Sequence, residues 1–137
     1  MSVRRFRGER GATAEMVIIL PALLLLIFLG IQFALWYHAS HVALAAAQEG
    51  ARAARVANAT NPVSARAAEQ TGIDTANQFL TGVAPTLLVS HDVQAHVLGG
   101  YDQVRVDVTG DVVTIVPGFS VHISEHSEGP VERFRRP

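Results

Sequence analysis

The chain has 137 residues, a formal net charge of -1, no cysteine, and only 17% charged residues against 49% hydrophobic ones. This length suffices for one small domain and one additional element, but not for two full enzyme domains. The composition excludes a disordered chain, the charge excludes a strongly basic nucleic-acid binder, and the lack of cysteine excludes disulfides, thiol nucleophiles and cysteine-ligated zinc.

The first element in chain order is the uncharged apolar stretch Met16–Tyr37. At about 1.5 Å per residue, a helix of this length crosses the roughly 30 Å hydrocarbon core of a membrane. It lacks the polar stripe of a soluble surface helix, and it ends on Trp36 and Tyr37, whose rings favour the membrane interface. We therefore predict a transmembrane helix in which Pro21 produces a mild kink.

The residues on either side of this stretch predict its orientation. Four arginines precede it, at positions 4, 5, 7 and 10, and the next basic residue after it is Arg52. The positive-inside rule therefore places the basic leader, residues 1–11, in the cytoplasm and the C-terminal domain outside the cell membrane. A cleaved secretory signal is the competing interpretation, although the apolar stretch is too long for one and only Ala43–Ala47 offers a small-residue cleavage site.

Helical character continues beyond the membrane. The segment His38–Ala57 is rich in alanine, Gly50 is its weak position, and Arg52 lies within reach of Glu49. We predict one helix from about Thr13 to Ala57, so that residues 12–57 form a transmembrane helix with an extracytoplasmic extension. Its small residues either let neighbouring helices approach closely or simply form an alanine-rich stalk.

Residues 58–85 are predicted to contain a break, a second helix and a linker. Asn61 is a good N-cap, Pro62 fits the first helical position, and Thr81–Pro85 should end the helix near Leu80. The expected apolar face consists of Val63, Ala67, Ile73, Ala76 and Leu80.

Beyond Pro85 the hydrophobic period changes from helical to two, which indicates β-strands. Apolar residues alternate over Val93–Val97 and Val104–Val108, with Gly99–Gly100 as a hairpin turn between them. Residues 86–126 are therefore predicted to form an antiparallel meander of three to four strands, with a polar, frayed tail at 127–137. A sheet with one apolar face needs a helix to cover it, so the expected fold class is α+β.

The end of the meander is less regular. Gly110-Asp111 predicts a turn or bulge, Val113–Ile115 continues the strand pattern, and Phe119–Ile123 alternates after Pro117-Gly118. The polar composition that is typical of the tail already begins at about Glu125, within the end of the predicted meander.

The six histidines are the residues that could suggest a metal site. His38 and His41 are three apart and His122 and His126 are four apart, but neither pair has a third ligand at a recognisable spacing. No serine lies in a nucleophile elbow, and no glycine-rich phosphate loop joins a strand to a helix. We therefore predict no enzyme activity, no cofactor and no metal. The acidic residues near the predicted strands are interpreted as solvated: Asp102, Asp107 and Asp111.

Glu15 lies at the head of the apolar helix. A carboxylate at the border of lipid is costly, which suggests a function. It could instead lie among the lipid headgroups and complement the positive N-terminus of the helix. The physical argument leaves both interpretations open.

A basic leader, a glycine, a few small residues, a glutamate and an apolar helix together resemble the class III signal of type IV pilin-like proteins. The stretch from Arg7 to Arg55 is similar to the TadE family of minor pilins, which belong to tight-adherence (Tad, or Flp) pilus systems, and its type resembles the actinobacterial one. The most specific parts are the Leu20-Pro21 step and the run QEGARAAR at Gln48–Arg55. The closing Val131–Arg135 also resembles that family.

This resemblance implies a non-catalytic minor pilin or pseudopilin that joins or primes a Tad pilus, or its membrane assembly platform, in secretion or cell adhesion. A prepilin peptidase would cut after Gly11 and leave Ala12 as the new N-terminus. Glu15 would then pair with the terminal amine of a neighbouring subunit, although it is the fourth residue after the cut and the usual position is the fifth.

The implied partners are membrane lipid, the prepilin peptidase, other pilin or pseudopilin subunits and the Tad platform, with no nucleic acid. The alternative function is that of a single-pass membrane-anchored binding or scaffold module that does not polymerise.

Overall fold

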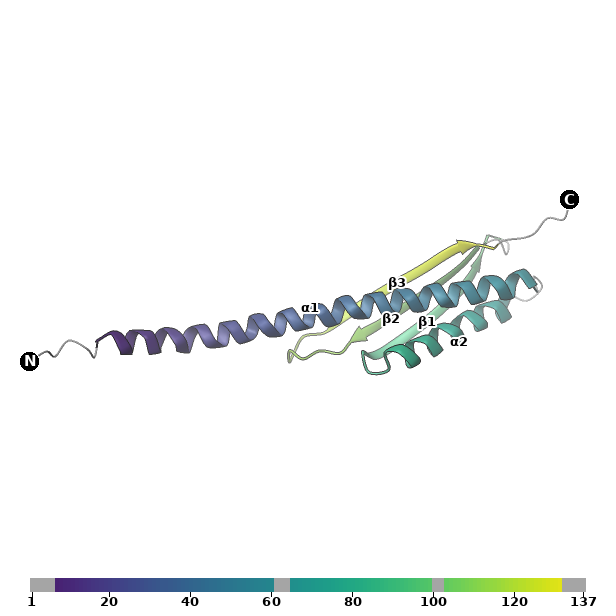
Figure 1. The fold of residues 1–137 in the computed structure, drawn as a ribbon. Coiled ribbons are helices and arrows are strands. Elements are labelled where there is room, and N and C mark those ends of the chain that lie inside the picture. The colour runs from purple at the N-terminus through teal and green to yellow at the C-terminus, as the bar shows by residue number, and fades with distance from the viewer. Residues whose placement is uncertain (1–6, 61–64, 100–102, 132–137) are drawn as a thin grey trace, which may run out of the picture.

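The computed structural model describes residues 7–60, 65–99 and 103–131, which form two helices and three strands (Figure 1). In chain order these elements are α1 (Arg7–Thr60), α2 (Ala65–Val83), β1 (Leu88–Leu98), β2 (Gln103–Val112) and β3 (Val121–Pro130). The expected α+β fold with a long first helix, a second helix and an antiparallel sheet is confirmed, with three strands in the sheet.

Helix α1 is a single helix of 54 residues that contains Pro21 without ending there. It begins at Arg7 and ends at Thr60, somewhat beyond the expected limits of residues 13 and 57. Its first half projects away from the rest of the molecule, whereas its second half lies against α2 and the sheet (Figure 1). The predicted cap of the second helix, Asn61-Pro62, lies outside the described residues.

Helix α2 runs back along the second half of α1 (Figure 1). Its buried residues recur every four positions: Ala68, Gly72, Ala76 and Leu80. The expected face was therefore wrong at Ala67, which is exposed, and correct at Ala76 and Leu80. A four-residue row of mostly small side chains lets the two helices approach more closely than the predicted row of larger ones. Val63 lies outside the described residues.

The sheet has the strand order β1-β2-β3, and both neighbouring pairs are antiparallel. Both helices lie on one of its faces, with α1 against β2 and β3 and α2 against β1. The predicted alternation of β2 is confirmed, because Val104, Val106 and Val108 are all 0% exposed. They pack under a row of α1 alanines that are equally buried, so the core is an alanine-rich helix surface on a valine-rich sheet.

The turn predicted at Gly110-Asp111 is not formed, whereas an irregularity of the bulge type lies opposite Asp111 in the partner strand. Gly110-Asp111 is not a turn, because both residues pair with β1 and β3 inside the ladder. The irregularity lies in the partner strand, where the register shifts between Leu88 and Ser90. A Cβ on Gly110 would lie 2.6 Å from the Ser90 carbonyl oxygen, so the glycine permits this close approach.

The prediction that Val113–Ile115 continues the strand pattern was also wrong, since residues 113–120 form a loop between β2 and β3. Phe119 belongs to this loop and not to the last strand. Conversely, β3 continues through Pro130, so residues 125–130 are paired with β2 and the sheet extends beyond its expected end at residue 126. The cross-strand partners of these polar residues stabilise them as strand, which their own composition did not indicate.

Candidate functional site: the apolar helix and the loop beside it

The first half of α1 presents its apolar side chains outward. Every described residue from Ala14 to Ile31 is exposed, and the large ones, such as Ile18 and Leu26, expose 75% and 67% of their surface. Among the described residues this is the one helix long and apolar enough to cross a membrane. A contiguous apolar surface of this size is unstable in water and stable in lipid, which supports single-pass anchoring in a membrane.

Gln32 is the one strongly polar side chain of the predicted span, and it is buried, with 4% of its surface exposed. Its amide nitrogen donates to the Val113 carbonyl oxygen at 3.3 Å, and its amide oxygen accepts from the Ile115 backbone N–H at 3.0 Å. The side chain therefore satisfies both a donor and an acceptor of the β2–β3 loop, in the way that a neighbouring strand would. This pair of hydrogen bonds joins the folded domain, made of the second half of α1, α2 and the sheet, to the apolar half of α1.

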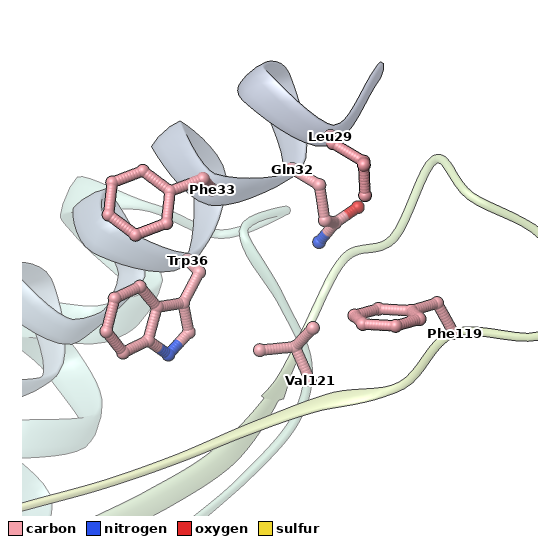
Figure 2. Close-up of a pocket in the computed structure, with 6 residues that line it drawn as sticks. All are labelled: Leu29, Gln32, Phe33, Trp36, Phe119 and Val121. Carbon is pink, nitrogen blue, oxygen red and sulfur yellow. The ribbon is translucent and has the colours of Figure 1, made fainter. Parts of the chain in front are cut away.

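The loop forms two apolar grooves with α1. The first has a volume of about 300 Å³ and lies between α1 and the start of β3, where Phe119 and Val121 face Leu29, Phe33 and Trp36 across the Gln32 amide (Figure 2). The second has a volume of about 370 Å³ and is lined by the residues that follow. These are Pro21, Leu24, Leu25, Phe28 and Leu29 of α1, and Ile115, Val116 and Pro117 of the loop. No charged side chain lines either groove.

The predicted processing and pairing residues all lie on α1. Gly11 and Ala12 lie within its first turns, and Glu15 lies on its exposed surface just before the large apolar residues begin. The structure places the three residues close together along one helix, at its end furthest from the sheet (Figure 1).

The run Gln48–Arg55, which carries much of the resemblance, lies where α1 meets α2 and β3. A Cβ on Gly50 would lie 2.7 Å from the Gly72 carbonyl oxygen, so the two helices are in near-backbone contact there. The guanidinium of Arg55 lies directly over Gly129 of β3, at a place where any Cβ would collide with it. Arg52 reaches Glu49 as expected, at 3.8 Å on the exposed side. Gly50 is therefore a requirement of the packing and not merely a weak position in the helix.

The outer face of the sheet carries a polar cluster around Asp111. Its carboxylate lies 3.0 Å from His122 Nδ1 and accepts from the Ser90 hydroxyl at 2.9 Å. These two contacts, that with His122 being the larger, lower the pKa of Asp111. The Ser90 hydroxyl donates to the same carboxylate that contacts the imidazole, and all three side chains lie on the exposed face of the sheet. Asp111 is thus solvated as predicted, but it also has specific partners.

A charged pair also lies on this face of the sheet. The Arg105 guanidinium donates to the Asp107 carboxylate at 2.7 Å, and this bond with the carboxylate charge raises the pKa of Arg105. Both side chains are on the solvent side of the strand, where such pairs contribute little to stability.

The histidine pairs are dispersed over the surface. His38 and His41 are exposed on α1, and the His41 ring packs edge-on against Tyr37 at 4.4 Å between centroids. His122 bonds to Asp111, whereas His126 pairs with Asp107 across the strands. Within residues 7–60, 65–99 and 103–131, no group of three histidine or acidic side chains is close enough to hold a metal ion.

Sequence reasoning missed the role of Gln32, which is the one strongly polar residue of the apolar stretch Met16–Tyr37. The signal that could have indicated the loop contact was the apolar and turn-forming composition of Val113–Phe119, in which Val113–Ile115 and Phe119 were interpreted as strand. Gln32 is a polar residue in an apolar helix, and Val113–Phe119 is an apolar segment with turn-forming residues. The structure joins the two by hydrogen bonds.

Comparison with known families supports the resemblance. Residues 11–52 match the family model of TadE-like proteins, and the whole match falls within α1. No curated protein and no solved structure matches the chain. Over these residues the chain is thus similar to TadE-like proteins.

Proposed function

We propose that this protein is a non-catalytic minor pilin or pseudopilin that joins or primes a Tad-type pilus or its membrane assembly platform. The observation that carries the proposal is the TadE-like helix, which exposes Ala14–Ile31 on all sides while its continuation is built into a folded domain. Such a helix is stable either in lipid or among similar helices, and assembly of a filament exchanges the first environment for the second.

The packing of α1 indicates which surface is available to other subunits. Its small residues beyond the membrane, such as Ala43, Ala47 and Ala54, are 0% exposed because α2 and the sheet cover them. The alanine-rich surface therefore serves the interior of this chain. In the proposed assembly, contact between neighbouring helices falls to the exposed residues Ala14–Ile31.

The proposed topology follows from charge. The leader arginines stay in the cytoplasm, because moving each through the hydrocarbon core costs about 3 kcal/mol even on the milder insertion scales. The sheet then lies outside the cell membrane. A prepilin peptidase cuts between Gly11 and Ala12 on the cytoplasmic side, and Glu15 pairs with the new amine of an adjacent subunit.

The mass of the membrane-bound protein in its native host tests this proposal. We expect the wild-type chain to begin at Ala12 and the variant Gly11→Val to remain full-length, because a branched side chain obstructs the cut. Gly8→Val is the matched control, since it makes the same change in the leader away from the cut and should be processed normally. Glu15→Ala should be processed but should be depleted from sheared filaments.

The same measurement distinguishes the competing functions. If wild type and Gly11→Val are both full-length, the protein is a permanent single-pass anchor or scaffold and does not polymerise. An N-terminus beyond about residue 40 would instead indicate a secreted domain released by a signal peptidase.

A further inference from the structure

We propose that the β2–β3 loop is a second membrane contact, in which the turn at Val116–Phe119 lies among the acyl chains of the outer leaflet beside α1. The proposal concerns the protein in its membrane and does not depend on whether it later enters a filament. Lipid acyl chains are the occupant of the two grooves between the loop and the helix.

The composition of the loop is that of a membrane-inserting segment. No charged residue occurs between Asp111 and His122, and the polar side chains inside this interval are Thr114 and Ser120. Ile115 and Phe119 expose 44% and 53% of their surface, so the domain core does not account for them. Large apolar side chains gathered on an exposed loop indicate a partner, and the nearest apolar phase is the one that surrounds α1.

The length of the apolar part of α1 requires the loop to enter lipid. Ile115–Pro117 line a groove with helix residues that include Phe28, and this groove extends as far as Pro21. If the loop stayed in water, the hydrocarbon core would have to end below Phe28. The stretch from Met16 to Phe28 would then span only about 20 Å, against the roughly 30 Å that is needed.

The aromatic residues of α1 agree with this position. Trp36 and Tyr37, which favour the headgroup region, lie nearer to the sheet than the second groove does. If they mark the outer interface, the contacts with Phe28 and Leu29 lie about 10–14 Å below it along the helix.

The backbone of the loop is suited to an apolar environment, where an unsatisfied N–H or C=O group is costly. The Phe119 N–H donates to the Val116 carbonyl oxygen at 3.3 Å, and Gly118 has a φ of +78°. With Pro117 before it, this is the geometry of a type II turn, in which proline also removes one N–H. On the approach to the turn, Gln32 satisfies the Val113 carbonyl and the Ile115 N–H, so the one strongly polar side chain of the span serves the inserted loop (Figure 2).

The test uses single cysteines in the full chain, which has none of its own. A spin label is attached at Phe119→Cys, and a second variant, Ile115→Cys, covers the case in which the first fails to fold. The controls are Leu26→Cys, in the span but outside both grooves, and Ser124→Cys on the exposed side of β3. The protein is reconstituted at low density in phosphatidylcholine vesicles, and collision of each label with oxygen, which enters lipid, is compared with collision with a water-soluble nickel chelate.

We expect the ratio of oxygen to nickel collisions at Phe119 and Ile115 to equal that at Leu26 and to exceed that at Ser124 several-fold. A ratio equal to that at Ser124 would place the loop in water and overturn the proposal. Shielding of the loop labels from both oxygen and the nickel chelate would also overturn the proposal. It would show that a protein neighbour, such as a second copy of this chain, and not lipid, occupies the two grooves.

Discussion

The two halves of α1 belong to one continuous helix but lie in different surroundings. From Ala14 to Ile31 every side chain is exposed, and most are leucine, isoleucine or phenylalanine. From Ala39 to Asn58 the buried positions recur at helical spacing and are mostly alanine, with Gly50 at the closest approach. Lipid accommodates large side chains of any shape, whereas a helix that lies on another helix and a sheet needs small ones. The size of the apolar residues, rather than their number, therefore distinguishes the two halves.

The largest expected effect comes from adding a side chain to a glycine in each half. A Cβ on Gly50 would lie 2.7 Å from the backbone of α2, whereas one on Gly30 would have nothing within 4 Å. We expect Gly50→Leu to lower the free energy of unfolding of the outer domain by about 1–3 kcal/mol or more, because the helices cannot separate without disturbing the sheet. Gly30→Leu should change it by less than about 0.5 kcal/mol.

Thermal unfolding in detergent, followed by circular dichroism, measures both variants. Equal melting temperatures for the two variants would show that the helices are not packed as closely as described.

A truncation in each half should give the next largest effect. Val106 is 0% exposed in the sheet, and Val106→Ala should cost about 2 kcal/mol through lost burial and the cavity left behind. Leu25→Ala removes more apolar volume, but from a side chain that is 61% exposed to the surroundings of the membrane helix. It should leave the melting of the outer domain unchanged, and a loss as large as that of Val106→Ala would mean that Leu25 belongs to the folded core.

The boundary between the halves is tested at Gln32. Gln32→Leu leaves the Val113 carbonyl and the Ile115 N–H without their partner, at a cost of about 1–2 kcal/mol. Gln48→Leu is the matched control, because Gln48 is exposed on the same helix. Hydrogen exchange at Ile115 should increase in Gln32→Leu and not in Gln48→Leu. Unchanged exchange in both would show that the hydrogen bonds to Gln32 do not hold the loop.

The smallest effect is expected from pH on the outer face of the sheet. Hydrogen bonds from His122 and then Ser90 lower the pKa of Asp111 below its ordinary value of 3.8. A carboxyl group whose pKa is lowered on folding contributes stability above the unfolded pKa and loses that contribution as the pH falls through the folded one. Because Asp111 is exposed, the contribution is small.

Melting temperatures of wild type and Asp111→Asn should therefore differ slightly at pH 6 and converge below about pH 3. A difference that grows as the pH falls would have the wrong sign and would contradict the assignment.

The sequence alone predicted the elements whose pattern is local. The span followed from an uncharged run, α2 from its proline and periodicity, and the inner strand from alternating valines. It failed where long-range contacts decide. Val113–Ile115 has the composition of a strand but bonds to Gln32, which is 83 residues from Ile115, and Glu125–Pro130 has the composition of a tail but pairs with β2.

The same division holds for the candidate site. The order of charge, glycine, glutamate and apolar helix is local, and it predicted a membrane helix that resembles that of TadE-like proteins. Only the tertiary structure decided that Gly50 meets the backbone of α2, that the alanine surface is used inside the chain, and that an apolar loop returns to the span. Side-chain polarity fixes which solvent a segment prefers, but close approach and hydrogen-bond partners depend on residues far apart in the chain, so the fold has to bring them together first.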